Sequence, residues 1–175
     1  ITPALLYPYG ETPLTLDEQG RPIAHPAVSR NGDTLLVAGA TDTELHALRI
    51  SSTENLLTGE TSIEQQRLDL PQLAEPIRAL QVDPRHLWLY AFSGKASADV
   101  FDLRRKQLNG RYKLAADGSE VTTVSPLLGG ISLMVGDSKG GIGQWFMVRG
   151  ADGQAELKHV RQFSLGDAPI TQIIP

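Results

Sequence analysis

The sequence contains no cysteine. That absence excludes disulfide bonds, zinc sites built on thiolates and a thiol nucleophile. Basic residues are also the minority, with 16 Lys and Arg against 20 Asp and Glu, which gives a formal net charge of −4. Because a nucleic-acid-binding domain needs a basic face to neutralise phosphates, this charge argues against nucleic acid as a partner.

Long apolar runs are also missing. The longest uncharged stretch, Val121 to Gly136, is interrupted by Pro126, Gly129 and Gly130. It falls short of the ~20 apolar residues that a membrane-spanning helix needs, so we predict a strand–turn–strand unit and expect this piece to be soluble. Because the chain begins without methionine and stops inside an expected strand, we also expect it to be a fragment of a longer protein.

The chain consists of a unit that recurs three times and then begins again. Each copy opens with a short apolar stretch, continues into a strand that is apolar on both faces, and returns through two further strands. The opening stretches are Ala27–Ser29, Ile77–Val82, Val121–Val124 and Ile170–Ile174. A period of roughly 40–50 residues with four strands per copy is typical of propeller blades.

The repeat predicts an all-β fold of β-propeller-like (WD40-like) blades, each of about four antiparallel strands, in an incomplete ring. Three blades are expected at about 27–70, 77–114 and 121–165, with partial blades at 1–26 and 168–175. The fourth strand of the first blade is expected at Gln65–Leu70, and the second strand of the second blade at Leu87–Phe92. No long amphipathic helix is expected. The insertion Thr53–Glu60 is predicted to hold at most one helical turn, ending at Gly59.

Two glycine-containing turns resemble catalytic or phosphate-binding motifs. Gly136–Gly140 matches G-x-S-x-G, but a nucleophile elbow needs a helix after the serine, and the following glycines favour a hairpin instead. The alternative left open for this turn is an anion cradle of backbone N–H groups beside Lys139. Ser93–Ser97 resembles a phosphate-binding loop, although Leu89 and Ala96 stand where Gly and Ser or Thr are required.

The remaining polar residues give no pattern of a catalytic or metal site. The histidines are scattered without metal-ligand spacing, and turn carboxylates are explained by hydrogen bonding to their own backbone. The sequence therefore predicts a protein that is not an enzyme, with no catalytic residue, no cofactor and no metal. The scattered histidines are His25, His46, His86 and His159, and the turn carboxylates are Asp33, Asp83 and Asp137.

Several segments of the sequence resemble those of one known protein family. They are Gly130–Arg149, Glu54–Glu60, Leu108–Leu114 and Leu165–Ile170. They resemble the periplasmic propeller-like domain of bacterial phosphate ABC transporter permeases (PstC-like). The resemblance implies a parent protein in the inner membrane, with this piece on its periplasmic face as a non-catalytic docking or sensing module in phosphate uptake. The implied partners are other transporter subunits or the substrate-binding protein.

Two other functions stay open at this point, a propeller lactonase-like hydrolase and a soluble protein-interaction scaffold. A hydrolase requires several Asp, Glu, His or Arg side chains that converge in one pocket. The expected open ends of the ring also expose apolar residues, namely Leu35, Val37, Ile170, Ile173 and Ile174. Because exposed apolar faces normally find a partner, we expect the isolated chain to form a homodimer.

Overall fold

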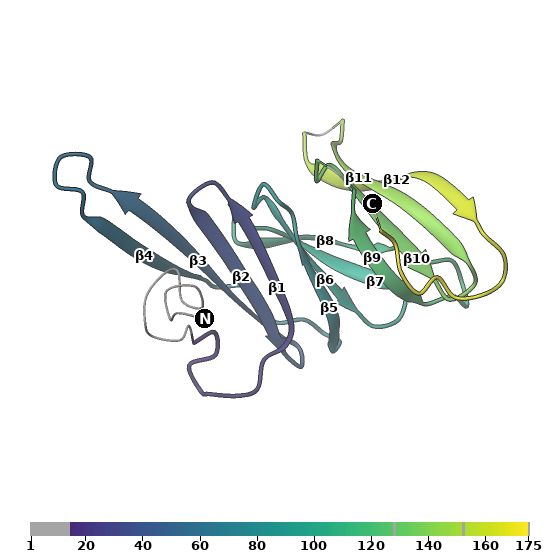
Figure 1. Ribbon diagram of the computed structural model, residues 1–175. Coiled ribbons are helices and arrows are strands. Elements are labelled where there is room, and N and C mark those ends of the chain that lie inside the picture. Colours follow the sequence, from purple (N-terminus) through teal and green to yellow (C-terminus); the bar gives the residue numbers. More distant parts are fainter. Residues whose placement is uncertain (1–14, 128, 152, 175) are drawn as a thin grey trace.

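The computed structural model describes residues 15–127, 129–151 and 153–174. They form three four-stranded antiparallel sheets, one after another along the chain (Figure 1). Sheet A contains β1 Ala24–Asn31, β2 Thr34–Thr41, β3 Glu44–Glu54 and β4 Thr61–Leu68. Sheet B contains β5 Ile77–Val82, β6 Trp88–Ser93, β7 Ser97–Asp102 and β8 Gln107–Lys113. Sheet C contains β9 Val121–Pro126, β10 Ser132–Asp137, β11 Gly141–Arg149 and β12 Ala155–Ser164.

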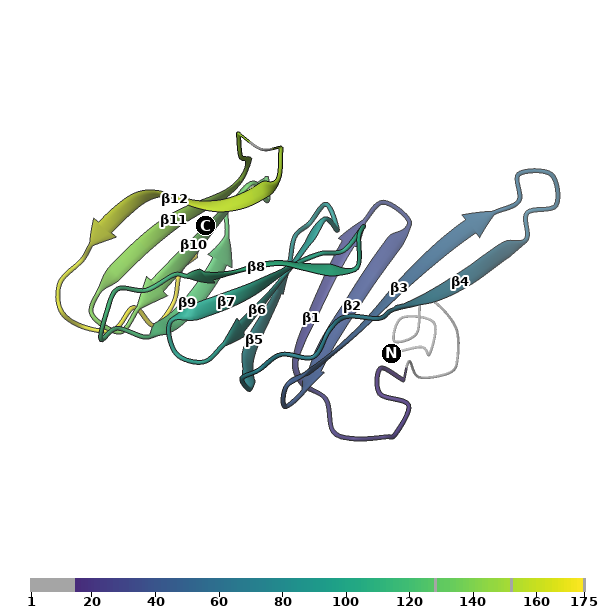
Figure 2. The same cartoon turned by 180° about the vertical axis from the view of Figure 1, so that it is seen from behind.

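Each sheet is a simple meander in which every strand pairs with the next strand of the chain. The sheets stand in a row in chain order and the row does not close on itself in the described residues, as both views show (Figures 1 and 2). The prediction of an all-β fold built from four-stranded antiparallel units is confirmed. In this described part of the chain no helix is long and apolar enough to cross a bilayer.

The middle sheet explains why the second strands are apolar on both faces. In β6, Leu89 and Ala91 pack in the cluster between sheets A and B, whereas Tyr90 and Phe92 pack in the cluster between sheets B and C. Successive side chains of a strand point to opposite faces, so a strand between two sheets needs apolar residues at every position. Leu36 and Phe101 are fully buried in the first cluster, and Val100 in the second.

The hairpin that joins β3 to β4 is longer than the sequence suggested. β4 begins at Thr61, ahead of the expected start at Gln65, and the hairpin projects beyond the rest of sheet A (Figures 1 and 2). Its tip holds a single turn in which Gly59 N–H donates to the Asn55 carbonyl at 2.7 Å. The predicted insertion is therefore a hairpin tip closed by one helix-like turn, and its Leu56 and Leu57 are over nine-tenths exposed.

The same backbone hydrogen bond marks the start of each new unit. Ile77 N–H donates to the Asp42 carbonyl at 2.9 Å, and Val121 N–H donates to the Lys95 carbonyl at 2.8 Å. Ile170 N–H repeats this bond to the Asp137 carbonyl at 3.0 Å. Each acceptor lies at or next to the turn that joins the second and third strands of the preceding sheet. Ile170 therefore occupies the position from which the earlier first strands begin.

In the described residues that are not part of β1, the two predicted partial blades show no strand of their own. Residues 15–23 and 170–174 lie outside any strand, and residues 1–14 and 175 lie outside the described part of the chain. The first strand of each sheet pairs only with the second strand, which follows it in sequence. No described strand pairs with residues 170–174, so this segment starts in the position of a first strand without forming a ladder.

Candidate interaction site

The row of sheets has two edges with different connections. The turns β1–β2, β3–β4, β5–β6, β7–β8, β9–β10 and β11–β12 lie on one edge, which we call the groove edge. The turns β2–β3, β6–β7 and β10–β11, together with the segments that lead from one sheet to the next, lie on the opposite edge, which we call the connection edge. This division follows from the meander, because successive turns of antiparallel strands alternate between the two ends of a sheet.

A groove of about 460 Å³ lies on the groove edge where sheet B meets sheet C. Four arginines from three segments far apart in sequence line it, and apolar side chains form much of the remaining wall. We call it the arginine groove. Its arginines are Arg85, Arg104, Arg105 and Arg149, and its apolar residues include Leu87, Trp88, Met147 and Val148.

The arginines of this groove are poorly matched by acids. Arg85 lies 3.5 Å from the carboxylate of Asp83, and Arg105 lies 3.8 Å from that of Asp102. The side chains of Arg104 and Arg149 make no ion pair or hydrogen bond within the described residues. All four arginines are exposed, so the groove presents positive charge to the solvent although the whole chain is negative.

Two carboxylates hold the loops that carry the arginines. Asp102 Oδ1 accepts the backbone N–H groups of Arg104 at 2.9 Å and Arg105 at 3.0 Å. In the preceding turn, Asp83 Oδ2 accepts the Leu87 N–H at 3.3 Å, and the Asp83 backbone carbonyl accepts the His86 N–H at 2.8 Å. These bonds are Asx and backbone turns, which fix loop shape. Both carboxylates therefore act mainly on the backbone, and they neutralise the neighbouring guanidinium groups only partly.

His86 anchors the arginine-bearing turn to sheet A. Its ring is buried, and Nε2 lies 3.0 Å from the Ser29 carbonyl of β1. Burial lowers the pKa of His86, because removal from water disfavours the charged imidazolium. The histidine is therefore a neutral packing group of the turn.

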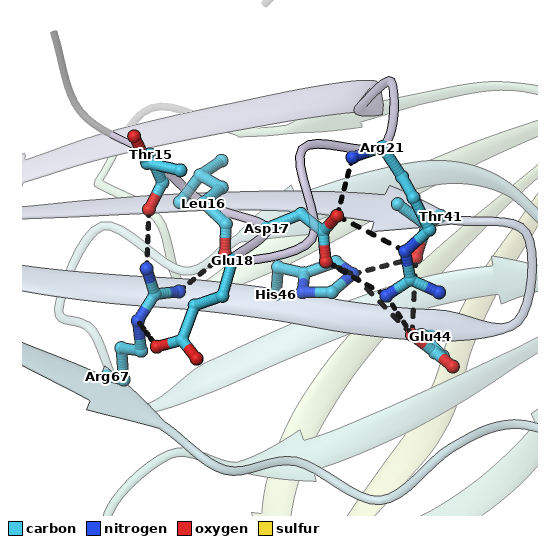
Figure 3. Close-up of polar contacts among 9 residues, drawn as sticks. All are labelled: Thr15, Leu16, Asp17, Glu18, Arg21, Thr41, Glu44, His46 and Arg67. Atoms are coloured by element: carbon cyan, nitrogen blue, oxygen red, sulfur yellow. Dashed lines mark hydrogen bonds and ion pairs between the residues drawn. The ribbon is translucent and has the colours of Figure 1, made fainter.

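A second polar cluster lies on the outer face of sheet A (Figure 3). Arg21 donates to Asp17 at 2.9 Å and to Glu44 at 2.6 Å. Arg67 donates to the Thr15 carbonyl at 2.6 Å, and its Nε lies 3.0 Å from Glu18. These bonds fasten residues 15–21, which precede β1, to β3 and β4. We call this cluster the Arg21 clasp.

Every charge of the clasp has an opposite charge beside it. The Arg21 guanidinium lowers the pKa of Asp17 far below its ordinary value of 3.8 and also lowers that of Glu44. His46 Nε2 lies 2.7 Å from the Thr41 hydroxyl and 3.9 Å from both carboxylates. Asp, Glu and His thus converge here, but around an arginine that neutralises the carboxylates. The arrangement is that of an ion-pair network in which Arg21 neutralises both carboxylates and the His46 ring is hydrogen-bonded to Thr41.

The G-x-S-x-G turn is a hairpin, as predicted. Ser138 lies between β10 and β11, and its Oγ accepts the Glu120 N–H at 3.0 Å. The anion cradle proposed for this turn is wrong, because Asp137 Oδ1 already accepts the Lys139 N–H at 2.8 Å and the Gly141 N–H at 2.9 Å. The chain's own carboxylate occupies the position of the anion.

The Ser93–Ser97 segment is likewise a turn between two strands, β6 and β7. The Lys95 ammonium lies 2.7 Å from the Glu120 carboxylate. The Ser93 hydroxyl donates to the buried Asp99 carboxylate. A phosphate-binding loop opens a helix and leaves its lysine for the phosphate, and this segment does neither.

The four histidines lie apart. His25 is exposed in β1, His46 belongs to the clasp, His86 is buried under its turn, and the ring of His159 packs against Trp145 with centroids 4.8 Å apart. Across the described residues, no group of three or more His, Asp or Glu side chains is placed to hold a metal ion. Within the described part of the chain, Asp, Glu and His converge in the clasp, where Arg21 neutralises the carboxylates, and Asp102 converges with arginines in the arginine groove.

No protein-family model and no curated protein sequence matches this chain. Solved structures do match. Hsv2 of Kluyveromyces lactis superposes with a TM-score of 0.53 at 15% identity, over 83% of this chain. The β-propeller domain of Cps50 (Swd1) of Myceliophteria thermophila superposes with a TM-score of 0.50 at 16% identity, over 81%. A chain of a mitotic checkpoint complex gives 0.52 at 14% identity, over 84%.

These similarities establish the fold. The chain consists of WD40-like β-propeller blades in an incomplete ring, as the repeat predicted. It spans 48% of the Hsv2 chain, 58% of the Cps50 domain and 38% of the checkpoint chain.

Proposed function

We propose that this chain is a non-catalytic protein-interaction module. The observation that carries the proposal is the arginine groove, in which side chains from two blades converge without forming a nucleophile or an acid–base pair. The carboxylate in its lining, Asp102, is engaged by two backbone N–H groups and by Arg105. A concave surface of charged and apolar groups without reactive chemistry is suited to binding.

The fold supports the same proposal. A row of blades offers an edge whose loops come from several units, so that a binding surface can be assembled without disturbing the cores. One structure with this fold is described as a mitotic checkpoint complex, which is an assembly of proteins. By analogy of fold alone, this chain would act by bringing proteins together.

Assays for hydrolysis test the non-catalytic part of the proposal. The wild type and Ser138→Ala should both show no turnover above background on ester, lactone and phosphoester substrates. Ser138→Ala should lower stability by about 1 kcal/mol, because the Glu120 N–H loses its acceptor. Turnover by the wild type that the substitution abolishes would restore the hydrolase hypothesis.

The resemblance to phosphate transporter permeases supports a more specific context. On that ground we place the module on the periplasmic face of the bacterial inner membrane, where it would dock the substrate-binding protein or another transporter subunit. The segment Gly130–Arg149, which resembles the permease family, contains the β10–β11 hairpin and ends at Arg149 of the groove. The sequence likeness is the whole support for this context.

Calorimetry with the purified phosphate-binding protein tests the transporter context. Binding should be saturable, and it should weaken in an Arg104→Glu/Arg149→Glu variant. Absence of binding with and without phosphate, together with a parent reading frame that lacks flanking apolar segments of ~20 residues, would contradict the context. The interaction module itself would still stand on the groove.

A further inference from the structure

The arginine groove contains two cations, Arg104 and Arg149, whose side chains have no partner in the described residues. The exposed guanidinium groups of Arg85 and Arg105 lie 3.5 and 3.8 Å from the carboxylates of Asp83, which is buried, and Asp102. Arg104 and Arg149 add two like charges beside Arg85 and Arg105 without a counter-charge of their own among the described residues. Because like charges held close together repel one another, the position of these two arginines is better explained by a ligand of opposite charge.

The apolar side chains of the arginine groove indicate which class of anionic ligand would fit it. Trp88 and Met147 are half-buried, from sheets B and C respectively, and both line the groove. Arginine and tryptophan are the residues that most often dominate protein–protein contacts. A guanidinium group binds a carboxylate through two parallel hydrogen bonds. The groove thus combines carboxylate-binding groups at its rim with an apolar surface between them.

We infer that the arginine groove binds a linear acidic segment of a partner protein, with an apolar side chain flanked by Asp or Glu. The apolar side chain would lie against Trp88 and Met147, while the neighbouring carboxylates would reach Arg104 and Arg149. This inference deepens the proposed function and rests on it, because it names the chemistry of the partner.

A nucleic acid fits the arginine groove less well than a short acidic protein segment does. The chain carries a formal net charge of −4, which opposes the approach of a polyanion at long range. The groove is also confined to the junction of two sheets. Lys106 extends its positive charge within the β7–β8 turn, but the groove-edge turns of sheet A carry the acids Asp33 and Glu60. A short acidic segment matches the extent of the groove.

Fluorescence anisotropy provides the test. The probe is a short labelled peptide in which Asp and Glu surround a central phenylalanine. The chain should bind it saturably, and binding should weaken as salt rises because exposed charges are screened. Arg104→Glu/Arg149→Glu should weaken binding about tenfold or more. Replacing the central phenylalanine of the peptide by alanine should also weaken it.

The matched control reverses two other exposed cations, Arg161 on β12 and Lys139 in the β10–β11 turn, whose side chains have no partner among the described residues. Arg161→Glu/Lys139→Glu changes the net charge equally and should leave peptide binding within about twofold. No saturable binding, or equal losses in the two double variants, would overturn the inference. So would an oligonucleotide that binds more tightly than the peptide and loses affinity in the groove variant. These outcomes leave the hydrolysis assays unaffected, so the inference can fail while the proposed function stands.

Discussion

The two edges of the row of blades carry charges in different ways. On and near the connection edge, cations are matched to acids: Arg111 to Glu75 at 2.5 Å and Lys95 to Glu120 at 2.7 Å. Arg21, Arg78 and Lys113 are paired there too, whereas the side chains of Lys139 and Arg161 have no partner among the described residues. On the groove edge, Arg104 and Arg149 have no partner among the described residues, and Arg85 and Arg105 lie 3.5 and 3.8 Å from their carboxylates, close to the 3.6 Å of the Arg78–Glu120 pair.

This difference indicates that the paired charged side chains stabilise the fold, whereas the unpaired ones are available to bind a ligand. The connection edge joins one sheet to the next, so its charges and backbone bonds hold the blades in series. The groove edge joins strands within a sheet, and its exposed loop side chains, unlike the buried His86, can vary without changing how one blade follows the next. We therefore expect substitutions on the connection edge to change stability and substitutions in the groove to change binding.

The largest expected effect comes from a matched pair of glycines. Gly140 on the connection edge and Gly153 on the groove edge share a φ of +78°. A Cβ at Gly140 would lie 2.2 Å from the Gly166 carbonyl oxygen, whereas nothing lies within 4 Å of one at Gly153. Gly140→Ala should lower the free energy of unfolding by about 3 kcal/mol or more, and Gly153→Ala by about 1 kcal/mol.

Urea unfolding of the two variants measures this difference. Both carry the same left-handed strain, so the excess for Gly140→Ala reports the close contact of the β10–β11 turn with the segment after β12. Equal losses would show that the connection edge is no more tightly packed than the groove edge.

The next effect is the pH dependence of the Arg21 clasp. Arg21 lowers the pKa of Asp17 and of Glu44 in the folded chain. Lowered carboxyl pKa values stabilise the fold above the ordinary values of 3.8 and 4.5, and this stabilisation is lost as pH falls through the lowered values. Arg21→Met should therefore lower Tm by several degrees at pH 7 and by progressively less below about pH 4.

Thermal melts of wild type and Arg21→Met between neutral and acidic pH give this comparison. Arg161→Met is the control, since it removes one arginine that has no partner in the described residues, and its Tm should follow the wild type at every pH. A difference between wild type and Arg21→Met that stays constant down to acidic pH would show that Arg21 acts by packing rather than by charge.

The smallest effect on stability is expected in the groove. Arg104→Glu/Arg149→Glu removes no ion pair or hydrogen bond of these side chains within the described residues. The free energy of unfolding should change by no more than about 0.5 kcal/mol. Chemical denaturation of this variant beside Arg161→Glu/Lys139→Glu checks the value. A loss of several kcal/mol would mean that the arginines hold the junction of sheets B and C together.

Much of the fold could be predicted from the sequence because each blade repeats a local pattern. Ile77–Val82 was predicted with the bounds observed for β5, and β6 was displaced by only one residue. β4 was placed too late, because Thr61–Gln66 is polar and exposed and lacks the apolar alternation that marks a strand. It forms a strand because it pairs with the end of β3, a tertiary cause that no local pattern carries.

The candidate site could not be predicted in the same way. Arg85, Arg104 and Arg149 belong to three different turns or strand ends, and each alone resembles an ordinary exposed charge. Their convergence depends on how sheet B packs on sheet C, which the repeat does not specify. A usable signal was nevertheless present, since these arginines lie at turns that a meander places on the same edge of neighbouring blades.

One paired measurement tests the separation of the two edges most directly. Peptide anisotropy and thermal melting are recorded on the same preparations of Arg104→Glu/Arg149→Glu and Arg21→Met. The groove variant should lose about tenfold or more in affinity and keep the wild-type Tm, while the clasp variant should lose several degrees in Tm and keep its affinity at temperatures where it is folded. Loss of both properties in both variants would contradict the account.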